Sequence, residues 1–405
     1  MMKLFTQVLK RWRIIFLLFH VEKKGKYKIP MKKNSFVDFY SQHNISPVSQ
    51  NIENIELHFQ RRSALFSSLG LPALLVKDSE ILEFGPGSGH NAIYTASLKP
   101  HRYHLIDGNP KGVRDTKELL SKYSIPDLKV ISSLFLDFRV KEKFDIVWAE
   151  GCIPHQADPI QILKHLAYFT TEGGIFVGTT ANGISYLSET IRRLGSFMHF
   201  DKSLSLNEQV SILRPMLRGH LDYLKGMSRP VDDWIIDNIL QPLQESKLIS
   251  IPDVIEALSD DFDIYGTSPK FITDWRWYKD ITGSKTRFNE IAEKSYYQTN
   301  LHLIDFNFNF QPHSINFGKE LEHLCDRSWE IMIKIQNDET SQWQVFFELL
   351  DSIADLISSN APQTAKAVKE SSRWLQDGAS LTVDLEFFPQ WWGRGQQYIS
   401  LIRKK

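Results

Sequence analysis

Glu80-Ile-Leu-Glu-Phe-Gly-Pro-Gly-Ser-Gly89 is the stretch from which the rest of the chain can be interpreted. Its first five residues are typical of a short buried strand, and glycines follow at positions 85, 87 and 89. Residues 90–98 then have helical spacing. A strand, a glycine turn and a helix in this order predict a ligand-binding corner, because glycines let a ligand approach the backbone and unpaired amides point outward at the helix start.

A second predicted strand, residues 103–107, supports this interpretation. It ends in Asp107, which lies 22 residues after Gly85, and Asn109-Pro110 then predicts the cap and first turn of another helix. A carboxylate at the end of the second strand of a doubly wound sheet lies where a ribose presents two hydroxyl groups. Asp107 is therefore predicted to bind the sugar of a nucleoside ligand.

Two residues of the glycine stretch argue against a dinucleotide and hence against an NAD-dependent oxidoreductase. The dinucleotide pattern requires a third glycine where this chain has His90. Glu83 stands just before the glycines, where its charge would repel a pyrophosphate and attract a cation.

The residues from Glu83 to Gly89, together with Asp107, resemble the cofactor site of class I S-adenosylmethionine-dependent methyltransferases. The resemblance covers residues 80 to about 182 and implies S-adenosyl-L-methionine, a sulfonium and ammonium compound without phosphate, as the cofactor. It implies an α/β fold with a doubly wound, mostly parallel seven-stranded sheet, an N-terminal helical cap and large helical insertions. The cofactor-binding residues that it predicts are Glu83, Gly85, Gly87, Gly89, Asp107, Ser133, Leu134 and Glu150.

Further strands are expected at residues 128–132, 144–150 and 175–178, with a helix that begins at Asp158-Pro159 and is ended by Gly173-Gly174. A sixth strand is expected at 261–266. The resemblance implies that it pairs antiparallel with a last strand at 397–403, across a helical insertion of about 110 residues.

These expectations divide the chain into seven segments. They are a basic leader (1–30), an N-terminal helical cap (31–79), the cofactor-binding core (80–182), a helical region (183–261), the sixth strand (262–270), a helical insertion (271–380) and a C-terminal segment with the last strand (381–405).

The leader differs in charge from the rest of the chain. Residues 1–33 contain ten Lys or Arg and one acidic residue, whereas the whole chain has 48 of each kind. Apolar residues at helical spacing predict a basic amphipathic helix that contacts a membrane surface through residues 1–20. The alternatives are a docked or disordered helix, or translation that starts at Met31, which would leave residues 1–30 as upstream sequence. The leader has neither a spanning apolar run nor a cleavage signature, so the protein is predicted to be cytoplasmic.

The overall charge and the cysteine content limit which nucleic acids and metal ions the protein is expected to bind. Equal numbers of basic and acidic residues create no global positive field, so DNA is not an expected partner and RNA is disfavoured. The two cysteines, Cys152 and Cys325, lack the spacing of a zinc site or a redox pair, so no metal is predicted.

A sulfonium methyl group is already activated, so its transfer mainly requires an acceptor nucleophile held close in a water-poor site. An alcohol acceptor would still benefit from a base, and His155, in the loop after the fourth strand, is the predicted catalytic residue. The alternative is a structural role for His155 in that loop. Two further sets of residues have a possible binding role and a structural alternative. The first set either closes over the cofactor or packs as a loop, and consists of Tyr40, His43 and Asn44. The second set either binds sugars or anionic small molecules or belongs to the core, and consists of Trp275-Arg-Trp-Tyr278 and Trp391-Trp392.

The leading hypothesis is therefore a methyltransferase that acts on a small-molecule or glycan acceptor, at oxygen, by in-line displacement. A non-catalytic S-adenosylmethionine-binding regulatory or scaffold protein is one alternative, and a protein or RNA methyltransferase is another.

Overall fold

The computed structural model describes residues 35–201, 203–243, 248–382 and 384–405. The predicted leader at residues 1–30 lies outside the described residues. Within the described ranges, none of the helices combines the length and the apolar character needed to cross a membrane.

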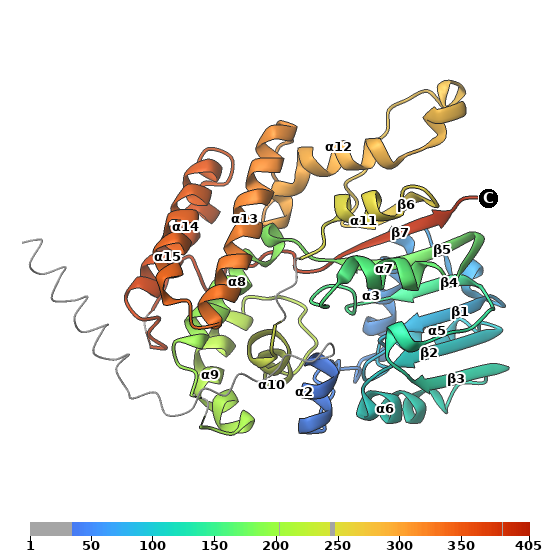
Figure 1. The fold of residues 1–405 in the computed structure, drawn as a ribbon, viewed down its shortest axis with the longest axis horizontal. Coiled ribbons are helices and arrows are strands. Elements are labelled where there is room, and N and C mark those ends of the chain that lie inside the picture. The colour runs from blue at the N-terminus through green and yellow to red at the C-terminus, as the bar shows by residue number, and fades with distance from the viewer. Residues whose placement is uncertain (1–34, 202, 244–247, 383) are drawn as a thin grey trace, which may run out of the picture. The chain divides into compact units, whose positions relative to one another are not determined.

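The described residues form a seven-stranded sheet in the order β3-β2-β1-β4-β5-β7-β6 (Figure 1). Five strands run parallel, namely β1 (Glu80–Phe84), β2 (Arg102–Asp107), β3 (Asp127–Ser132), β4 (Phe144–Ala149) and β5 (Thr170–Thr180). β7 (Gln397–Arg403) lies between β5 and β6 (Phe262–Ser268) and is antiparallel to both. The structure thus confirms the predicted fold class and the antiparallel pairing of the last two strands.

The strand order reverses between β1 and β4, because the chain builds β2 and β3 on one side of β1 and returns to the other side for β4. Ligands of doubly wound sheets bind outside the carboxyl ends of the strands at such a reversal. The glycine turn after β1 and the loop after β4 are therefore neighbours at the carboxyl edge of the sheet.

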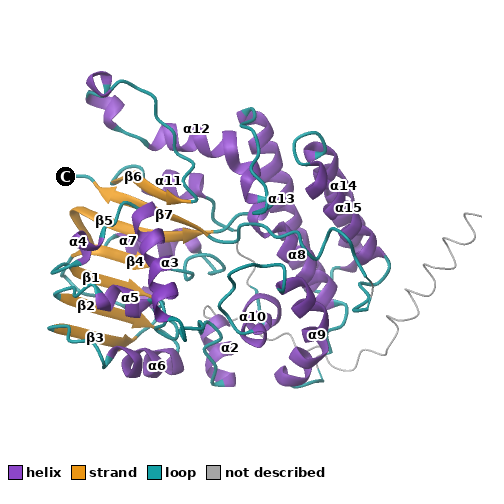
Figure 2. Ribbon diagram, turned by 180° about the vertical axis from the view of Figure 1, so that it is seen from behind, coloured by secondary structure: helices purple, strands orange, loops and turns teal. Residues whose placement is uncertain are grey.

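Helices cover both faces of the sheet (Figures 1 and 2). On one face α3 (Ile55–Ser68) and α5 (Ala92–Ser97) share a core with Ile81 of β1, and α6 (Pro110–Leu120) contributes its last residue to that core. On the other face α7 (Pro159–Ala167) and α11 (Ile251–Leu258) pack with Leu82 and Phe84. Ile81 and Leu82 belong to different cores because the side chains of successive residues in a strand point to opposite faces of the sheet.

The N-terminal cap is divided into three helices, α2 (Ser35–His43), α3 and α4 (Ala73–Val76). The side chain of Asn54 caps α3 by accepting a hydrogen bond of 3.0 Å from the Leu57 amide. Gly70, with a φ of 73°, and Pro72 follow the helix, and neither residue favours its continuation.

The remaining helices form a body beside the carboxyl edge of the sheet (Figure 1). They are α8 (Gly183–Phe197), α9 (Leu206–Leu221), α10 (Val231–Ile235), a π-helix (Ile236–Leu240), α12 (Asn289–Thr299), α13 (Ile315–Gln336), α14 (Trp343–Ile357) and α15 (Pro362–Gln376). Short 3₁₀ helices cover Phe135–Asp137, Tyr278–Asp280, Gly283–Thr286, Asn300–Leu303 and Thr340–Gln342.

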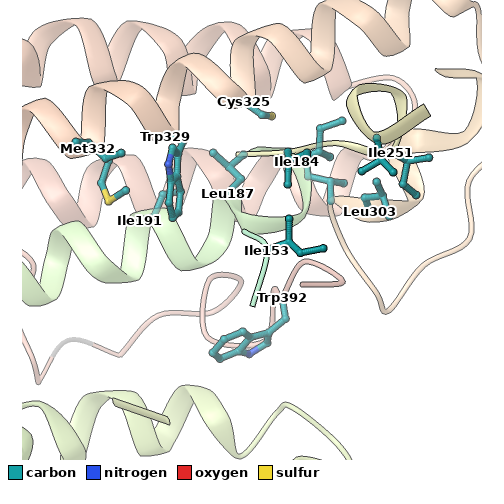
Figure 3. Packing of buried hydrophobic residues seen from close by; sticks show 14 of the residues in the cluster. Ile153, Ile184, Leu187, Ile191, Ile251, Leu303, Cys325, Trp329, Met332 and Trp392 are labelled. Carbon is teal, nitrogen blue, oxygen red and sulfur yellow. The ribbon is translucent and has the colours of Figure 1, made fainter. Parts of the chain in front are cut away.

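The centre of this body is the contact between α8 and α13. Trp329 and Met332 of α13 face Leu187 and Ile191 of α8, and Ile153 from the loop after β4 reaches the same cluster (Figure 3). Helices from two distant parts of the sequence therefore pack together and bury the loop that follows β4.

One predicted boundary is wrong. The helix that begins at Pro159 ends at Ala167, and Gly173 and Gly174 lie inside β5 rather than after the helix. The pairing of β4 with β5 shifts register between Phe144 and Ile146, and Gly173 has a φ of 72°. Gly173 and Gly174 therefore lie where the pairing of β5 is irregular, and glycine adopts the backbone conformation needed there at a low cost in free energy.

Candidate cofactor and acceptor site

The turn at residues 85–89 requires glycine for two reasons, its backbone conformation and the closeness of neighbouring side chains. Gly85, Gly87 and Gly89 have φ values of 71°, 58° and 79°, a region that other residues adopt rarely. A Cβ atom on Gly87 would lie 2.5 Å from a methyl group of Val48, and one on Gly85 would lie 2.8 Å from the Cβ of Cys152. The turn thus allows close approach to its backbone.

Asp107 ends β2 directly beside this turn. Its Oδ2 accepts a hydrogen bond of 2.9 Å from the Gly87 amide, and its Oδ1 accepts one of 2.7 Å from the Asn109 amide. Burial raises the pKa of Asp107 to about 6, although both hydrogen bonds act in the opposite direction. A carboxylate has about four acceptor sites, so Asp107 retains capacity for the two hydroxyls of a ribose.

Glu83 occupies the penultimate position of β1 and is buried. It accepts a hydrogen bond from the hydroxyl group of Tyr103. Burial raises the pKa of Glu83 to about 7, and the Tyr103 hydrogen bond only partly offsets this effect. A cation brought close to Glu83 would favour its ionised form and lower its pKa.

Ser133 and Leu134 follow β3 and lie next to Asp107. The Ser133 amide donates a hydrogen bond of 3.0 Å to the carbonyl oxygen of Asp107. A side-chain methyl of Leu134 lies 3.2 Å from where a Cβ on Gly108 would be. Both residues, predicted from the sequence to bind the cofactor, therefore lie beside Asp107 at the end of β3.

Glu150 has surroundings that the sequence did not indicate. Its two oxygens accept hydrogen bonds of 2.9 and 2.8 Å from Arg62, 3.0 Å from Asn91, 3.0 Å from the Trp148 indole and 2.8 Å from Tyr398. Burial opposes the charge of Glu150, but Arg62 and these hydrogen bonds hold its pKa below the usual value. The geometry thus disagrees with the prediction that Glu150 binds the cofactor: five hydrogen bonds leave its carboxylate little capacity for a ligand, and it ties α3, β4 and β7 together.

α2 and the segment between α2 and α3 lie across the corner. Val48 contacts Gly87, and Val37 lies against Gly108. The side chain of Asn109 donates 2.9 Å to the Ile45 carbonyl oxygen, and Arg114 donates 3.0 Å to the side chain of Asn44. No feature of the sequence distinguishes these two valines, because their role depends on a contact between segments about 40 residues or more apart.

A polar group, the Tyr40 cluster (Tyr40, Arg229, Asp237 and Gln241), lies between α2 and the π-helix. The Tyr40 hydroxyl is 2.6 Å from Asp237 Oδ1 and 2.8 Å from Gln241 Oε1, and Arg229 forms an ion pair with Asp237. The pKa of Tyr40 is raised first by burial, next by Asp237 and more weakly by Asp107. Val37, on the same helix as Tyr40, lies against Gly108, so α2 connects this cluster with the corner.

His155 lies in the loop between β4 and α7, beside aromatic residues of α8 and α13. Its φ is 65°, a conformation unusual for a residue with a side chain, and its ring centroid lies 5.6 Å from that of Tyr186 and 5.4 Å from that of Trp329. Burial and the charge of Arg193 lower its pKa to about 4, while Asp237 raises it. The imidazole is therefore neutral at neutral pH.

A cavity of about 450 Å³ lies between residues 45–49 and α6. Its lining includes Ser46, Ser49, His90, Lys111, Asp115 and Asp233. Neither Asp107 nor His155 lines it, and Asp115 is engaged by Lys111 at 2.6 Å. The donor and acceptor chemistry expected for a nucleoside is at the corner rather than in this cavity. Nowhere in the described residues do three or more His, Cys, Asp or Glu side chains gather as a metal site.

Comparison with known proteins agrees with this geometry. Residues 82–176, which span the strands from β1 into β5, match the family model described as a methyltransferase domain. The chain carries a class I S-adenosylmethionine-dependent methyltransferase domain. S-Adenosyl-L-methionine is the cofactor of this methyltransferase.

Solved structures with similarity to the chain include two that are described as methyltransferases. N-methyltransferase NodS from Bradyrhizobium japonicum WM9, in complex with S-adenosyl-l-homocysteine, is 14% identical over 57% of this chain and 89% of its own, with a TM-score of 0.33. A putative sarcosine dimethylglycine methyltransferase from Galdieria sulphuraria is 10% identical over 87% and 88% of the two chains, with a TM-score of 0.36. At these scores the similarities say nothing about the acceptor. No curated protein matches the chain.

The residues present fit the cofactor of the methyltransferase. Glu83 provides a buried carboxylate for a cation, Asp107 has acceptor capacity for a ribose, and the positive φ values of the turn allow close approach to the backbone. The fit rests on Glu83, Asp107 and the turn, whereas Glu150 is used in the scaffold.

Proposed function

We propose that the methyltransferase transfers a methyl group to a hydroxyl oxygen of a small-molecule or glycan acceptor, bound between the corner and the Tyr40 cluster. The observation that carries this proposal is the position of Tyr40 on α2: its hydroxyl lies 2.6 Å from Asp237, while Val37 of the same helix lies against Gly108, the residue after Asp107. One site beside the cofactor thus offers several hydrogen-bonding groups.

The chemistry of the Tyr40 cluster favours a neutral, hydroxyl-rich acceptor. Arg229 and Asp237 compensate each other's charge, while Tyr40 and Gln241 add neutral donors and acceptors. Tyr40 is partly buried and its hydroxyl lies between the side chains of Asp237 and Gln241, which suits a small acceptor better than a macromolecule. We therefore place protein and RNA acceptors second and expect no DNA.

We propose roles for the cofactor-binding residues on the same grounds. Asp107 accepts hydrogen bonds from the ribose, Glu83 stabilises the cationic end of the cofactor, and Ser133 and Leu134 border the adenine. The glycines at 85, 87 and 89 let the cofactor approach the backbone. When bound, S-adenosyl-L-methionine supplies a methyl group on a sulfonium, which an acceptor oxygen can displace in line.

The low pKa of His155 limits the role in proton transfer that we propose for it. A neutral imidazole can accept a hydrogen bond from the acceptor hydroxyl through a ring nitrogen, but a pKa of about 4 makes it a weak base. We therefore propose that His155 orients the hydroxyl and takes its proton only late in the transfer. His155→Gln is then expected to reduce kcat by about tenfold and to leave cofactor affinity unchanged; unchanged turnover would remove this role.

The test of the proposed function uses cell extract, the full-length protein and methyl-labelled cofactor, with untargeted mass spectrometry of the products. We expect one labelled small-molecule or glycan product, with the methyl group on oxygen, and its loss in the Asp107→Asn variant. Label that enters only protein or RNA would overturn the proposed acceptor class. Cofactor binding without any labelled product would favour the non-catalytic alternative.

A further inference from the structure

Three exposed aromatic residues gather in the segment between β6 and α12. Trp275, Trp277 and Tyr278 are 93%, 60% and 71% exposed, whereas Trp391 and Trp392, the other aromatic pair noted in the sequence, are 1% exposed. The segment from 270 to 288, here called the arm, projects past the end of α12, away from α13 (Figures 1 and 2). Large aromatic side chains in water mark an interaction site when they are clustered.

The arm has a defined structure that presents these rings outward. Arg276 pairs with Asp274 at 2.7 Å, donates a hydrogen bond of 2.8 Å to the Lys285 carbonyl oxygen and lies over the Phe288 ring at 5.4 Å. Arg276 thus joins the two halves of the arm at its base. Its neighbours on either side, Trp275 and Trp277, are left exposed.

The charge of the arm differs in sign from that of the rest of the described chain. Lys and Arg occupy five positions of the arm and Asp two, whereas residues 34–405 as a whole have 38 basic and 47 acidic residues. Lys279 lies over the exposed rings, with its ammonium nitrogen 5.3 Å from the Trp277 ring and 5.9 Å from the Tyr278 ring. The arm therefore combines aromatic rings with positive charge on a projecting surface.

We propose that the arm docks the methyltransferase on an anionic lipid surface. Tryptophan and tyrosine are enriched where a protein meets the membrane interface, and lysine beside them attracts anionic headgroups. Sites for sugars and other small ligands are concave, whereas the arm projects outward. A lipid surface accommodates such a projection, and the positive charge of the arm complements anionic headgroups on an otherwise acidic protein.

The test is cosedimentation of the full-length protein with phosphatidylcholine vesicles, with and without phosphatidylglycerol. We expect binding to the anionic vesicles, weakened by high salt, and a loss of about tenfold or more in the variant with Trp275→Ala and Trp277→Ala. Lys279→Glu should reduce the preference for anionic vesicles. Tyr223→Ala, at a 51% exposed tyrosine outside the arm, is the matched control and should bind as the wild type does.

Two further measurements keep the result specific to the arm. Because the leader is also basic and apolar, Lys10→Glu with Arg11→Glu tests its contribution, and the arm variant should still lose binding in that background. Thermal unfolding of the arm variant should match the wild type, since the replaced rings are exposed. Equal vesicle binding by wild type and arm variant would overturn the proposal. So would a wild-type dimer, seen without lipid, that the arm variant converts to monomer, because the arm would then bind a second copy of the chain.

Discussion

Asp107 and Glu150 stand at the carboxyl edge of the same sheet, yet their carboxylates have different surroundings. Asp107 accepts two hydrogen bonds, both from backbone amides, whereas Glu150 accepts five from side chains, four of them from segments 59 or more residues away along the chain. Burial raises the pKa of Asp107 to about 6, while Arg62 and its other partners keep the pKa of Glu150 low. Of two acidic residues in similar positions, one has acceptor capacity for a ligand and the other joins parts of the scaffold.

The largest expected effect comes from removing one of the distant segments altogether. Residues 396–405 contain β7, which lies between β5 and β6 and supplies Tyr398 to Glu150. Deleting them leaves β6 without a partner strand and removes Ile399 and Leu401, both fully buried, so the core residues that they cover become exposed to water. We expect loss of the cooperative thermal transition, measured by circular dichroism. A shortened chain that still unfolds cooperatively near the wild-type midpoint would contradict this role for β7.

The second-largest effect is expected from a substitution of Glu150, and it concerns the stability of the fold. Glu150→Gln removes the charge that compensates Arg62, whose side chain is only 8% exposed, so the free energy of unfolding should fall by about 3–5 kcal/mol in denaturant titrations. The matched control is Asp355→Asn at the exposed pair with Lys369, which should have little effect. A loss no larger than that of the control would mean that Glu150 is not a scaffold residue.

Asp107→Asn is expected to act on the cofactor more than on stability. Hydrogen bonds to a charged group contribute about 1.5–3 kcal/mol, so affinity for S-adenosylhomocysteine, measured by calorimetry, should fall about 10- to 100-fold. Asp145→Asn is the control, because Asp145 Oδ2 accepts a backbone hydrogen bond of 2.9 Å from Glu80 at the opposite edge of the sheet. Unchanged affinity in Asp107→Asn, or an equal loss in both variants, would count against the ribose contact.

The smallest expected effect is a pH dependence of cofactor affinity from Glu83. With a pKa near 7 in the free protein, Glu83 must lose a proton to pair with a cation, so affinity should fall as pH decreases below about 7 and approach about tenfold per pH unit. Asp107, with a pKa of about 6, adds a second decrease below that pH. Glu83→Gln should flatten the profile between about pH 6 and 8. An unchanged profile in this variant would assign the dependence to another group.

The sheet and the corner could be predicted from the sequence because their signals are local. The strand at 80–84, the three glycines and Asp107 all lie within 28 residues, and each has a backbone or charge requirement that its own residue type reveals. The order of the last two strands required the resemblance, since about 130 residues separate β6 from β7.

The parts that could not be predicted depend on contacts across the chain. Glu150 follows a strand as a ligand-binding acid would, and only its contacts with Arg62 and Tyr398, 88 and 248 residues away, show that its carboxylate is in use. Composition likewise cannot separate Trp275 from Trp391. One is exposed on the arm and the other lies in the core, because burial is decided by the surrounding helices.

The central claim is that S-adenosyl-L-methionine binds at the corner formed by Glu83, the glycine turn and Asp107. A crystal structure of the full-length protein with S-adenosylhomocysteine tests it most directly. We predict density for the nucleoside beside Gly87, with the ribose hydroxyls in hydrogen-bonding distance of Asp107 and no ligand contact to Glu150. Ligand density in the cavity near Lys111 and Asp233 instead, with none at the corner, would contradict the account.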